Sequence, residues 1–325
     1  MGKKVAIIGA GLAGLTCART LRQAGIAIEV FEAEGHAGGR IATMCAGNDR
    51  FDHGAQYLCA QSDEFRSYLA EISGLGYADQ WLPRVAEAEG HRVLGGEPWI
   101  VGVPGMSSIV RPLTDGVRVA FGRRVQSLEQ REKGWHLWFE DEKSSGPFDF
   151  VAIAVPAAEA MRLLDPIKGF APTLRRVRML PCWALMVRID DKTFPDLDVF
   201  RNVSQVLHWI ARDNSKPGRE PNGETLVAHA SPAWSFAAEQ GDAMDVAEEL
   251  WSEVGAVLGL SPVRPSRMLA YLWRQSIVGQ ALGETHLYSA ESRVGVAGDW
   301  CLGAFAEHAF TSGNHLGRAI AAAIG

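Results

Sequence analysis

The fold is decided by residues 4–25, KVAIIGAGLAGLTCARTLRQAG, which join an apolar run to a glycine-rich turn and a helical pattern. The β-branched run KVAII is typical of a buried parallel strand. The turn holds Gly9, Gly11 and Gly14 in a GxGxxG pattern, and the helical pattern ends at Gly25. The order of strand, turn and helix predicts a dinucleotide-binding unit.

Each glycine of the turn has a separate role in such a unit. Gly9 permits the tight turn, Gly11 lets a pyrophosphate approach the backbone, and Gly14 lets the helix pack against the strand. The N-terminus of the helix attracts the phosphate charge. The competing interpretation is a glycine-rich turn without a ligand.

A second strand pattern, AIEVFEAE at 27–34, places Glu32 about 20 residues past the turn. A carboxylate there accepts hydrogen bonds from both ribose hydroxyls and repels a 2′-phosphate. Residues 35–40, GHAGGR, form a second glycine cluster that ends at Arg40, which can pair with a pyrophosphate. This cluster resembles the GGR element of the FAD-binding fold of amine oxidases and related flavoproteins, and the resemblance implies noncovalently bound FAD.

The middle of the chain alternates in short strands from Val117, which are VRVAF, RVQSLEQ, GWHLWFEDE and FDFVAIAVP. They resemble the β-meander inserted in FAD-binding domains, and that resemblance implies a backbone contact from Val125 to adenine. After Pro156 we expect helices over AAEAMRLL and PTLRRVRML, then longer strands over CWALMVRID, VLHWIAR, ETLVAHAS and RMLAYLW. The helix pattern DAMDVAEELWSEVGAVLG, 242–259, has one apolar face.

The fold class is therefore α/β, with a Rossmann-like FAD-binding domain, an inserted β-meander and an α+β substrate domain with an antiparallel sheet. We expect a discontinuous FAD-binding domain of residues 1–75, 100–164 and 286–325. We expect a substrate domain of residues 76–99 and 165–285.

The end of the chain, RVGVAGDWCLGAFAEHAFTSGNHLGRAI at 293–320, reads as a last parallel strand, a Gly-Asp stop and a helix. Gly298 and Asp299 then lie at the carboxyl end of the strand, where open α/β sheets bind ligands. Asp299 is predicted to accept a hydrogen bond from the ribityl chain. The helix, predicted from about Glu307 to Ile320, is expected to point its N-terminal amides at the flavin and to stabilise the negative charge of the reduced ring.

Several stretches together resemble the renalase family. They are DHGAQY (52–57), PGMSSI (104–109), ARDNSKP (211–217), AHAS (228–231), LWR (272–274) and AGDWC (297–301). The resemblance covers almost the whole chain and implies an FAD enzyme that oxidises the 2- and 6-dihydro isomers of NAD(P)H to NAD(P)+ and reduces O2 to H2O2. Some family members carry a basic or histidine pair before the tryptophan of LWR, where this chain has Tyr271 and Leu272.

The predicted contacts fall into two sets. Those to FAD are Gly9, Gly11, Ala13, Gly14, Glu32, Ala33, Gly39, Arg40, Gly54, Ala55, Gln56, Val125, Gly298, Asp299, Glu307 and His308. Those to the substrate are Gln56, Arg212, Lys216, His229, Trp273, Arg274 and Trp300, in which the cations offer charge to phosphates and the indoles offer flat faces. For each tryptophan ordinary core packing is the alternative, for Arg212 and Lys216 a solvated loop, and for His229 a satisfied wall histidine.

Two other functions stay open at this point. A flavin amine oxidase shares the FAD fold, but it must admit a neutral amine and commonly frames it with an aromatic pair, and no motif here marks such a pair. A protein that binds a nucleotide without chemistry is the third. A hydride donor that becomes aromatic needs no acid or base, so catalysis reduces to positioning the donor.

Composition excludes several classes of function. A formal net charge of −6 in 325 residues, with no basic block, argues against nucleic acid as a partner. No apolar run approaches the ~20 residues needed to cross a bilayer. Five cysteines without CxxC or zinc-finger spacing fit reduced thiols in a cytoplasmic protein, and no metal site is expected.

Overall fold

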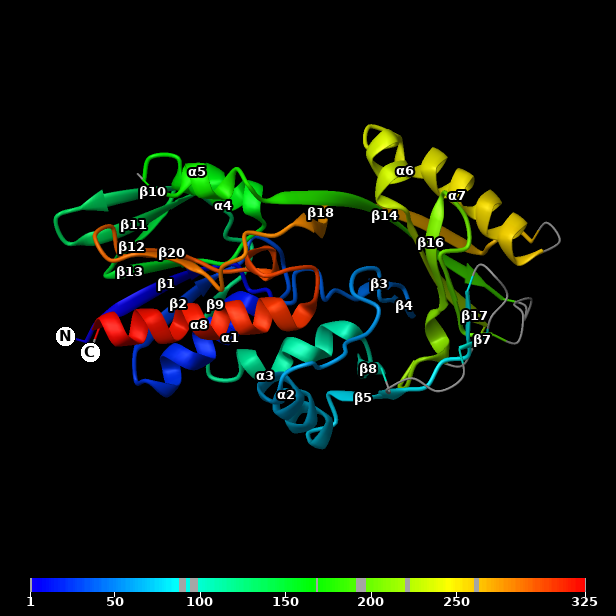
Figure 1. Cartoon of the computed structure of the whole chain (residues 1–325), viewed down its shortest axis with the longest axis horizontal. Helices are drawn as coiled ribbons and strands as arrows, with labels where there is room; N and C mark the ends of the chain where they lie inside the picture. The colour runs from blue at the N-terminus through cyan, green and yellow to red at the C-terminus, as the bar shows by residue number, and fades with distance from the viewer. Residues whose placement is uncertain are drawn as a thin grey trace.

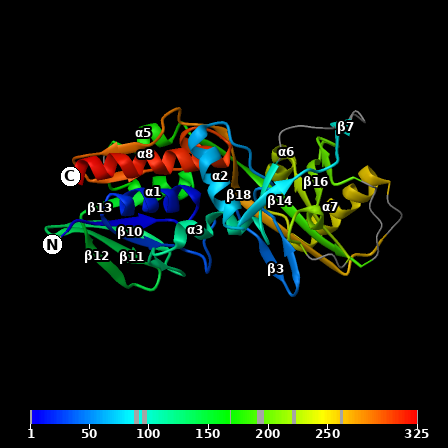
Figure 2. The same cartoon turned by 90° about the horizontal axis from the view of Figure 1, so that it is seen from below.

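The computed structural model describes residues 2–87, 92–93, 99–167, 169–190, 197–219, 223–259 and 263–324. Two lobes are visible in Figure 1, one built on a six-stranded sheet and the other on a seven-stranded sheet. The long strands β14 (Arg178–Ile189) and β18 (Arg267–Gln280) run between the lobes, and the turned view in Figure 2 shows the same separation.

The six-stranded sheet has the order β19-β20-β13-β1-β2-β9, and every neighbouring pair in it is parallel except β19 with β20. Its strands are β1 (Lys4–Ile8), β2 (Ala27–Phe31), β9 (Val119–Ala120), β13 (Phe150–Ile153), β19 (Leu287–Ser289) and β20 (Val294–Val296). This sheet confirms the α/β class, and β20 is the last parallel strand that the sequence predicts within RVGVAGDW.

Alternate residues of β1 point into two different cores. Val5 and Ile7 pack with α1 (Leu12–Gln23) and α8 (Ala306–Ile324), whereas Ala6 and Ile8 pack with the β-meander on the opposite face. Both faces of the sheet are therefore covered, which explains why β1 is apolar throughout rather than alternating.

The two helices on the first face approach each other closely. A side-chain carbon at Gly313 of α8 would overlap the carbonyl oxygen of Ala13 in α1, and one at Gly317 would lie 2.7 Å from the Cβ of Thr20. Small residues at these positions let α8 lie against the helix that follows the glycine turn. The end of the chain is thereby fixed beside its beginning (Figure 1).

The β-meander is smaller than the sequence predicts. It consists of the antiparallel strands β10 (Val125–Arg131), β11 (Gly134–Phe139) and β12 (Ser144–Phe148). VRVAF instead supplies β9 at the edge of the main sheet, and FDFVAIAVP supplies β13 in its centre. The period of a short apolar run identifies a strand but does not say which sheet it joins.

The seven-stranded sheet has the order β18-β14-β17-β16-β15-β6-β7 and is antiparallel except where β15 meets β6. Its shorter strands are β6 (Val85–Glu87), β7 (Arg92–Val93), β15 (Val199–Arg201), β16 (Leu207–Arg212) and β17 (Glu224–Ala230). On one face, Leu185 and Val187 of β14 pack with Val246 and Leu250 of α7 (Ala243–Leu258). The helix predicted over 242–259 therefore covers this sheet.

The remaining elements lie outside these two sheets and the β-meander. The strands are β3 (Met44–Ala46), β4 (Asp49–Phe51), β5 (Ala78–Trp81) and β8 (Trp99–Gly102). The helices are α2 (Asp63–Gly74), α3 (Arg111–Thr114), α4 (Ala157–Leu164), α5 (Ala171–Leu174) and α6 (Pro232–Ala237), with short 3-10 turns η1 (Met106–Val110), η2 (Asp213–Ser215) and η3 (Asp299–Cys301).

One predicted helix is wrong. PTLRRVRML forms a single turn, α5, and its last residues enter β14 at Arg178. Pairing with β18 along the whole length of β14 outweighs the local helical pattern of these residues. The predicted boundary between the two domains stays a prediction, since part of its 76–99 segment lies outside the described residues.

None of the helices in the described ranges is both long and apolar enough to span a membrane.

Candidate active site

A cavity of about 1370 Å3 runs between the lobes, from the glycine turn to the seven-stranded sheet. It is larger than the roughly 300–1,000 Å3 of ordinary small-ligand pockets. Its wall includes the predicted residues Gly9, Gly11, Ala13, Glu32, Ala33, Gly39, Arg40, Gly54, Ala55, Gln56, Val125, His229, Trp273, Arg274, Gly298, Asp299 and Trp300. The structure therefore brings most of both predicted sets to one cavity.

The three glycines of the turn have three different environments. Gly9 has φ +101°, and a side-chain carbon there would lie 2.5 Å from the carbonyl oxygen of Ala154. A carbon at Gly14 would overlap the carbonyl of Gly9, so helix and turn are in direct contact. A carbon at Gly11 would meet nothing within 4 Å. Of the three glycines, Gly11 is the one that leaves open space where a side chain would stand, as the close approach of a pyrophosphate requires.

The second glycine cluster packs on the first. The amide of Gly38 donates to the carbonyl of Ala10 at 2.9 Å, and Gly11 and Gly38 form an isolated parallel bridge. A side-chain carbon at Gly39 would lie 3.5 Å from the Cα of Gly11. The GGR element thus braces the turn as well as delivering Arg40 to the cavity.

Glu32 is buried at the end of β2 and is held in place by the backbone. Its Oε2 accepts from the amide of Ala10 at 2.7 Å, and its Oε1 accepts from the amide of Glu34 at 2.9 Å. The carboxylate is thereby fixed beside the glycine turn and in the cavity wall. Its predicted contact with ribose hydroxyls stays a prediction.

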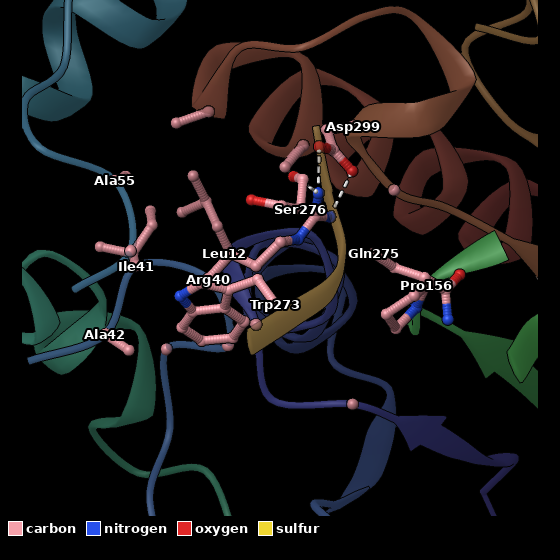
Figure 3. Close-up of a pocket in the computed structure, with 18 of the residues that line it drawn as sticks. Leu12, Arg40, Ile41, Ala42, Ala55, Pro156, Trp273, Gln275, Ser276 and Asp299 are labelled. Carbon is pink, nitrogen blue, oxygen red and sulfur yellow. Dashed lines mark hydrogen bonds and ion pairs between the residues drawn. The ribbon is translucent and has the colours of Figure 1, made fainter. Parts of the chain in front are cut away.

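Arg40 and Asp299 bind each other across the cavity, as the dashed lines in Figure 3 show. The two hydrogen bonds of the guanidinium to the carboxylate measure 2.7 and 2.5 Å, and Nη1 also donates to the carbonyl of Ser276 at 3.0 Å. A bidentate pair of this kind fixes the direction of both side chains. It links the GGR element, β18 and η3, which are far apart in the sequence.

Five strands of the seven-stranded sheet contribute one residue each to a row across the cavity end of the sheet. The register pairs Arg201 with Trp209, Trp209 with His229, His229 with Ala184, and Ala184 with Tyr271. All of them except Ala184 line the cavity. Directly paired residues on neighbouring strands lie on the same face of a sheet, so the row forms the floor of this end.

The carbonyl of His53 orients two ring side chains of the cavity wall. It accepts from the indole N–H of Trp273 at 2.9 Å and from Nε2 of His229 at 3.2 Å. The imidazole of His53 also stacks on Trp273, with ring centroids 5.0 Å apart. One backbone oxygen therefore sets the orientation of an indole and of an imidazole that both face the cavity.

Both histidines stay neutral near pH 7. Burial, together with neighbouring His208, lowers the pKa of His229 to about 3, although the hydrogen bond to His53 acts in the opposite direction. Burial also lowers the pKa of His53 to about 4. Neither ring therefore brings positive charge to the cavity.

Lys216 is not in the cavity wall, although the sequence predicts it in the substrate pocket. Its side chain is 0% exposed, and Nζ donates to Asp213 at 2.6 Å, to Asp52 at 3.2 Å and to Oε1 of Gln56 at 3.2 Å. Arg219 also pairs with Asp52. Two fully buried carboxylates attract the lysine inward, so it acts on the cavity only through Gln56.

The other predicted cations are also paired. Arg212 lies outside the cavity wall, because its guanidinium pairs with Asp198. Arg274 lines the cavity but is 60% exposed and pairs with Glu239 at 3.0 Å. Of the three cations predicted to hold substrate phosphates, Arg212 and Lys216 therefore lie outside the cavity wall, and Arg274 lies in it.

Trp300 does not present a face to a substrate. It is 0% exposed, and its indole N–H donates to the carbonyl of Val155 at 3.0 Å. Its ring fills the space over Gly298, where a side-chain carbon would lie within 3 Å of the indole. The core-packing alternative that the sequence left open applies to this tryptophan.

Glu307 and His308, which the sequence predicts to contact FAD, do not line the cavity. The carboxylate of Glu307 accepts from the backbone amides of Gln61 and Ser62, both at 2.7 Å, just before α2. Nδ1 of His308 accepts from the amide of Phe305 at 3.3 Å, within the entry to α8. Ala304, Phe305 and Ala306 lie at the cavity in their place.

We therefore expect Glu307→Ala to lower stability without removing bound FAD. Two charge-assisted hydrogen bonds are lost, so we expect a cost of about 1.5–3 kcal/mol. Burial raises the pKa of Glu307, but the hydrogen bonds from Ser62 and Gln61 outweigh it and the net shift is downward. A lowered pKa gives stability that is present above the unfolded value and lost on acidification.

Urea unfolding of both proteins at pH 7 and pH 4 measures this effect, and the difference between them should shrink at pH 4. Loss of the flavin absorbance from Glu307→Ala at pH 7 would contradict this structural role.

Reasoning from the sequence missed many residues of the cavity wall, among them Arg201, His208, Trp209, Tyr271 and His53. His53 lies within the DHGAQY stretch and Tyr271 lies just before LWR, but neither stretch identifies these two residues as part of the wall, and no motif surrounds Arg201, His208 or Trp209. The only signal is the alternation of strand residues, which becomes informative once strand register is known. Among the residues that the structure describes, no group of three His, Cys, Asp or Glu side chains could hold a metal ion.

Comparison with known families decides the class of this site. The NAD(P)-binding Rossmann-like domain matches residues 7–72, and the family described as flavin containing amine oxidoreductase matches residues 77–320, more than half of the chain. The chain belongs to the flavin-containing amine oxidoreductase family. It is an FAD-dependent oxidoreductase, and the open backbone at Gly11 beside fixed Glu32 fits that cofactor.

Curated relatives of this flavin-containing protein match over parts of their length. The FAD-dependent urate hydroxylase of Klebsiella oxytoca is 29% identical over 59% of this chain and 50% of its own. Protoporphyrinogen oxidase 2 of Arabidopsis thaliana is 35% identical over 22% of this chain and 14% of its own. The chain thus spans half or less of the length of these relatives.

Solved structures of two oxidases share the whole fold. Cyclohexylamine oxidase from Brevibacterium oxydans has a TM-score of 0.77 at 14% identity, covering 99% of both chains. Putrescine oxidase bound to putrescine gives the same TM-score and identity, also with 99% of both chains covered. At this level of identity the likeness concerns the fold alone.

Proposed function

We propose that the protein is an oxidase of renalase type that oxidises the 2- and 6-dihydro isomers of NAD(P)H to NAD(P)+. Bound FAD would supply the acceptor for the hydride and return its two electrons to O2 as H2O2. The donor loses one hydride, which leaves an aromatic pyridinium, so no proton has to leave carbon. The residues of this chain then have only to bind and orient the donor.

The observation that carries this proposal is the distribution of charge in the cavity. Its carboxylates, among the described residues, are Glu32, Glu34, Glu159 and Asp299, all from the lobe of the six-stranded sheet, which also contributes Arg40, Arg123 and Arg124 to the wall. The seven-stranded sheet contributes Arg201 and Arg274 and, in its described part, no carboxylate to the wall. This end favours an anionic donor, such as a dinucleotide, over an ammonium ion.

The second candidate is oxidation of a small amine, which the family assignment and the shared fold leave compatible. Aromatic side chains line the same end, with Tyr57 and Trp209 stacked at 5.6 Å and Tyr271 beside Trp273 at 4.8 Å. An amine enters mostly as its cation near pH 7, and the arginines of this end oppose that charge. The charge distribution therefore favours the dihydronicotinamide.

Anaerobic mixing tests the proposal directly. We expect 2- or 6-dihydro-NAD to bleach the flavin absorbance of the purified holoenzyme within seconds and admission of air to restore it with formation of H2O2. The matched comparison is the ordinary 4-dihydro isomer, together with a series of primary amines at pH 9. No bleaching by either unusual isomer would refute the proposal, and bleaching by the amines alone would establish the second candidate.

A further inference from the structure

Each of two histidines in the cavity wall uses one ring nitrogen in a hydrogen bond to a backbone carbonyl. Nε2 of His229 lies 3.2 Å from the carbonyl of His53, and Nδ1 of His208 lies 3.0 Å from the carbonyl of Ala230. A carbonyl oxygen only accepts, so each of these nitrogens carries the proton. In a neutral imidazole the other nitrogen is then an acceptor, namely Nδ1 of His229 and Nε2 of His208.

These two acceptor nitrogens have no hydrogen-bond partner among the described residues. Neither of them is fully buried, so each keeps some accessible surface. Both residues line the cavity, and their ring centroids are 6.0 Å apart. The register between β16 and β17 shifts between Leu207 and Trp209, so His208 lies at an irregularity of the strand. Such bulges redirect a side chain, and here the result is a second imidazole beside His229.

Both rings keep this acceptor character near pH 7. Burial lowers the pKa of His208 as well as that of His229, so both imidazoles are neutral. A nitrogen whose conjugate acid has a pKa of about 3 is a poor proton acceptor, but it still accepts a hydrogen bond. The pair is therefore suited to recognising an N–H group rather than to removing a proton.

We propose that Nδ1 of His229 and Nε2 of His208 form an acceptor site that binds an N–H donor group of the substrate. If the proposed function holds, that group is the primary carboxamide on the nicotinamide ring. Its NH2 presents two donors, one for each histidine. The carbonyl of His53 acts as the positioning group, since it fixes the tautomer of His229 and holds Trp273 beside it.

The test compares two ligands that differ only at this group, NAD+ and its 3-acetylpyridine analogue, in which a methyl replaces the NH2. Binding to the oxidised holoenzyme is followed by the change that each ligand makes in the flavin spectrum. A net hydrogen bond contributes about 0.5–1.5 kcal/mol and the carboxamide makes two of them, so we expect wild type to bind NAD+ about 5- to 160-fold more tightly than the analogue.

The variants His229→Phe and His208→Phe remove one acceptor each at similar size. We expect the preference for the carboxamide to fall in each variant to about 2- to 13-fold, the contribution of the one hydrogen bond that remains, while binding of the analogue changes little. His136→Phe, outside the cavity wall, is the matched control and should keep the full preference. The flavin content of each purified variant verifies folding.

The outcomes separate this site from the proposed function. A wild type without preference, or variants that keep it in full, would overturn the acceptor site even if dihydro-NAD bleaches the flavin. A preference that depends on the histidines, without bleaching by either isomer, would support the site and overturn the proposed reaction alone.

Discussion

Gly11→Val is expected to give a folded protein that keeps less than one tenth of the FAD bound to wild type. Gly11 has ordinary extended backbone, with φ −76° and ψ 179°, and an added side chain meets no protein atom within 4 Å. Valine therefore occupies only the open space beside the turn, where the pyrophosphate must approach the backbone. A tenfold loss of affinity corresponds to ~1.4 kcal/mol, which a steric overlap at this point readily exceeds.

The measurement is the ratio of flavin to protein absorbance after purification, together with the circular dichroism spectrum and melting temperature of the apoprotein. Gly14→Val is the informative comparison, because its side chain would overlap the carbonyl of Gly9 and should damage the fold as well as FAD binding. Gly25→Val is less suitable as a control, since φ is +75° there, so Gly255→Val on α7 serves instead. Full flavin content in Gly11→Val would show that the turn does not hold the cofactor.

The contrast between these two glycines also shows which part of the site the sequence could predict. The turn is local, because all of its roles follow from spacing within about ten residues of β1 and α1. The same holds for Glu32, which ends the next strand. Every residue predicted from this unit lies where the fold pattern requires, and Gly14 is absent from the cavity wall because its role is packing.

The substrate end could not be predicted in this way. Arg201, Trp209, His229 and Tyr271 come from four strands spread over about 70 residues, and only the register of the sheet places them in one row. Spacing along the chain carries no information about such pairing.

The sequence wrongly predicts Arg212 and Lys216 in the substrate pocket for a related reason. A cation in a polar loop is expected in solvent or at a ligand, but Arg212 finds Asp198, 14 residues earlier, and Lys216 finds Asp52, 164 residues away. Partners that far apart in sequence become visible only in the fold. The resemblance to renalase identified the segment that contains them but could not say which way their side chains point.

Lys216→Met is expected to lower the stability of the protein by about 3–5 kcal/mol. Lys216, Asp52 and Asp213 all have 0% exposed side chains, so removing the ammonium leaves carboxylate charge buried without its main partner. Arg219 still pairs with Asp52, whereas within the described part of the chain the Asp213 carboxylate keeps only the hydrogen bond from the amide of Asp52 at 3.1 Å. Urea unfolding at pH 7 measures the loss, and Lys143→Met, on an exposed side chain, is the control.

The double variant Lys216→Met with Asp213→Asn distinguishes the cost of an unpaired buried charge from the cost of altered packing. Removing both partners of a buried pair costs less than removing one, so we expect the double variant to regain at least ~1 kcal/mol over Lys216→Met. An asparagine oxygen can still accept from the amide of Asp52. If the single and double variants are equally unstable, the cost arises from packing and not from unpaired charge.

The pH dependence of stability gives an independent check on the same cluster. Burial alone would raise the pKa of Asp52, but Lys216 and Arg219, with the hydrogen bonds from Met106 and Thr43, lower it to about 2. Stability from this carboxylate is present above its unfolded pKa of about 3.9 and is lost as pH falls toward 2. Lys216→Met removes the first of the two cations, so the stability of this variant should fall less steeply than that of wild type over that interval.

The same cluster joins the two parts of the cavity. Asp52 lies beside His53, in the segment that carries Gln56, whereas Asp213, Lys216 and Arg219 follow β16 of the seven-stranded sheet. Weakening the cluster should therefore loosen both ends of the cavity together.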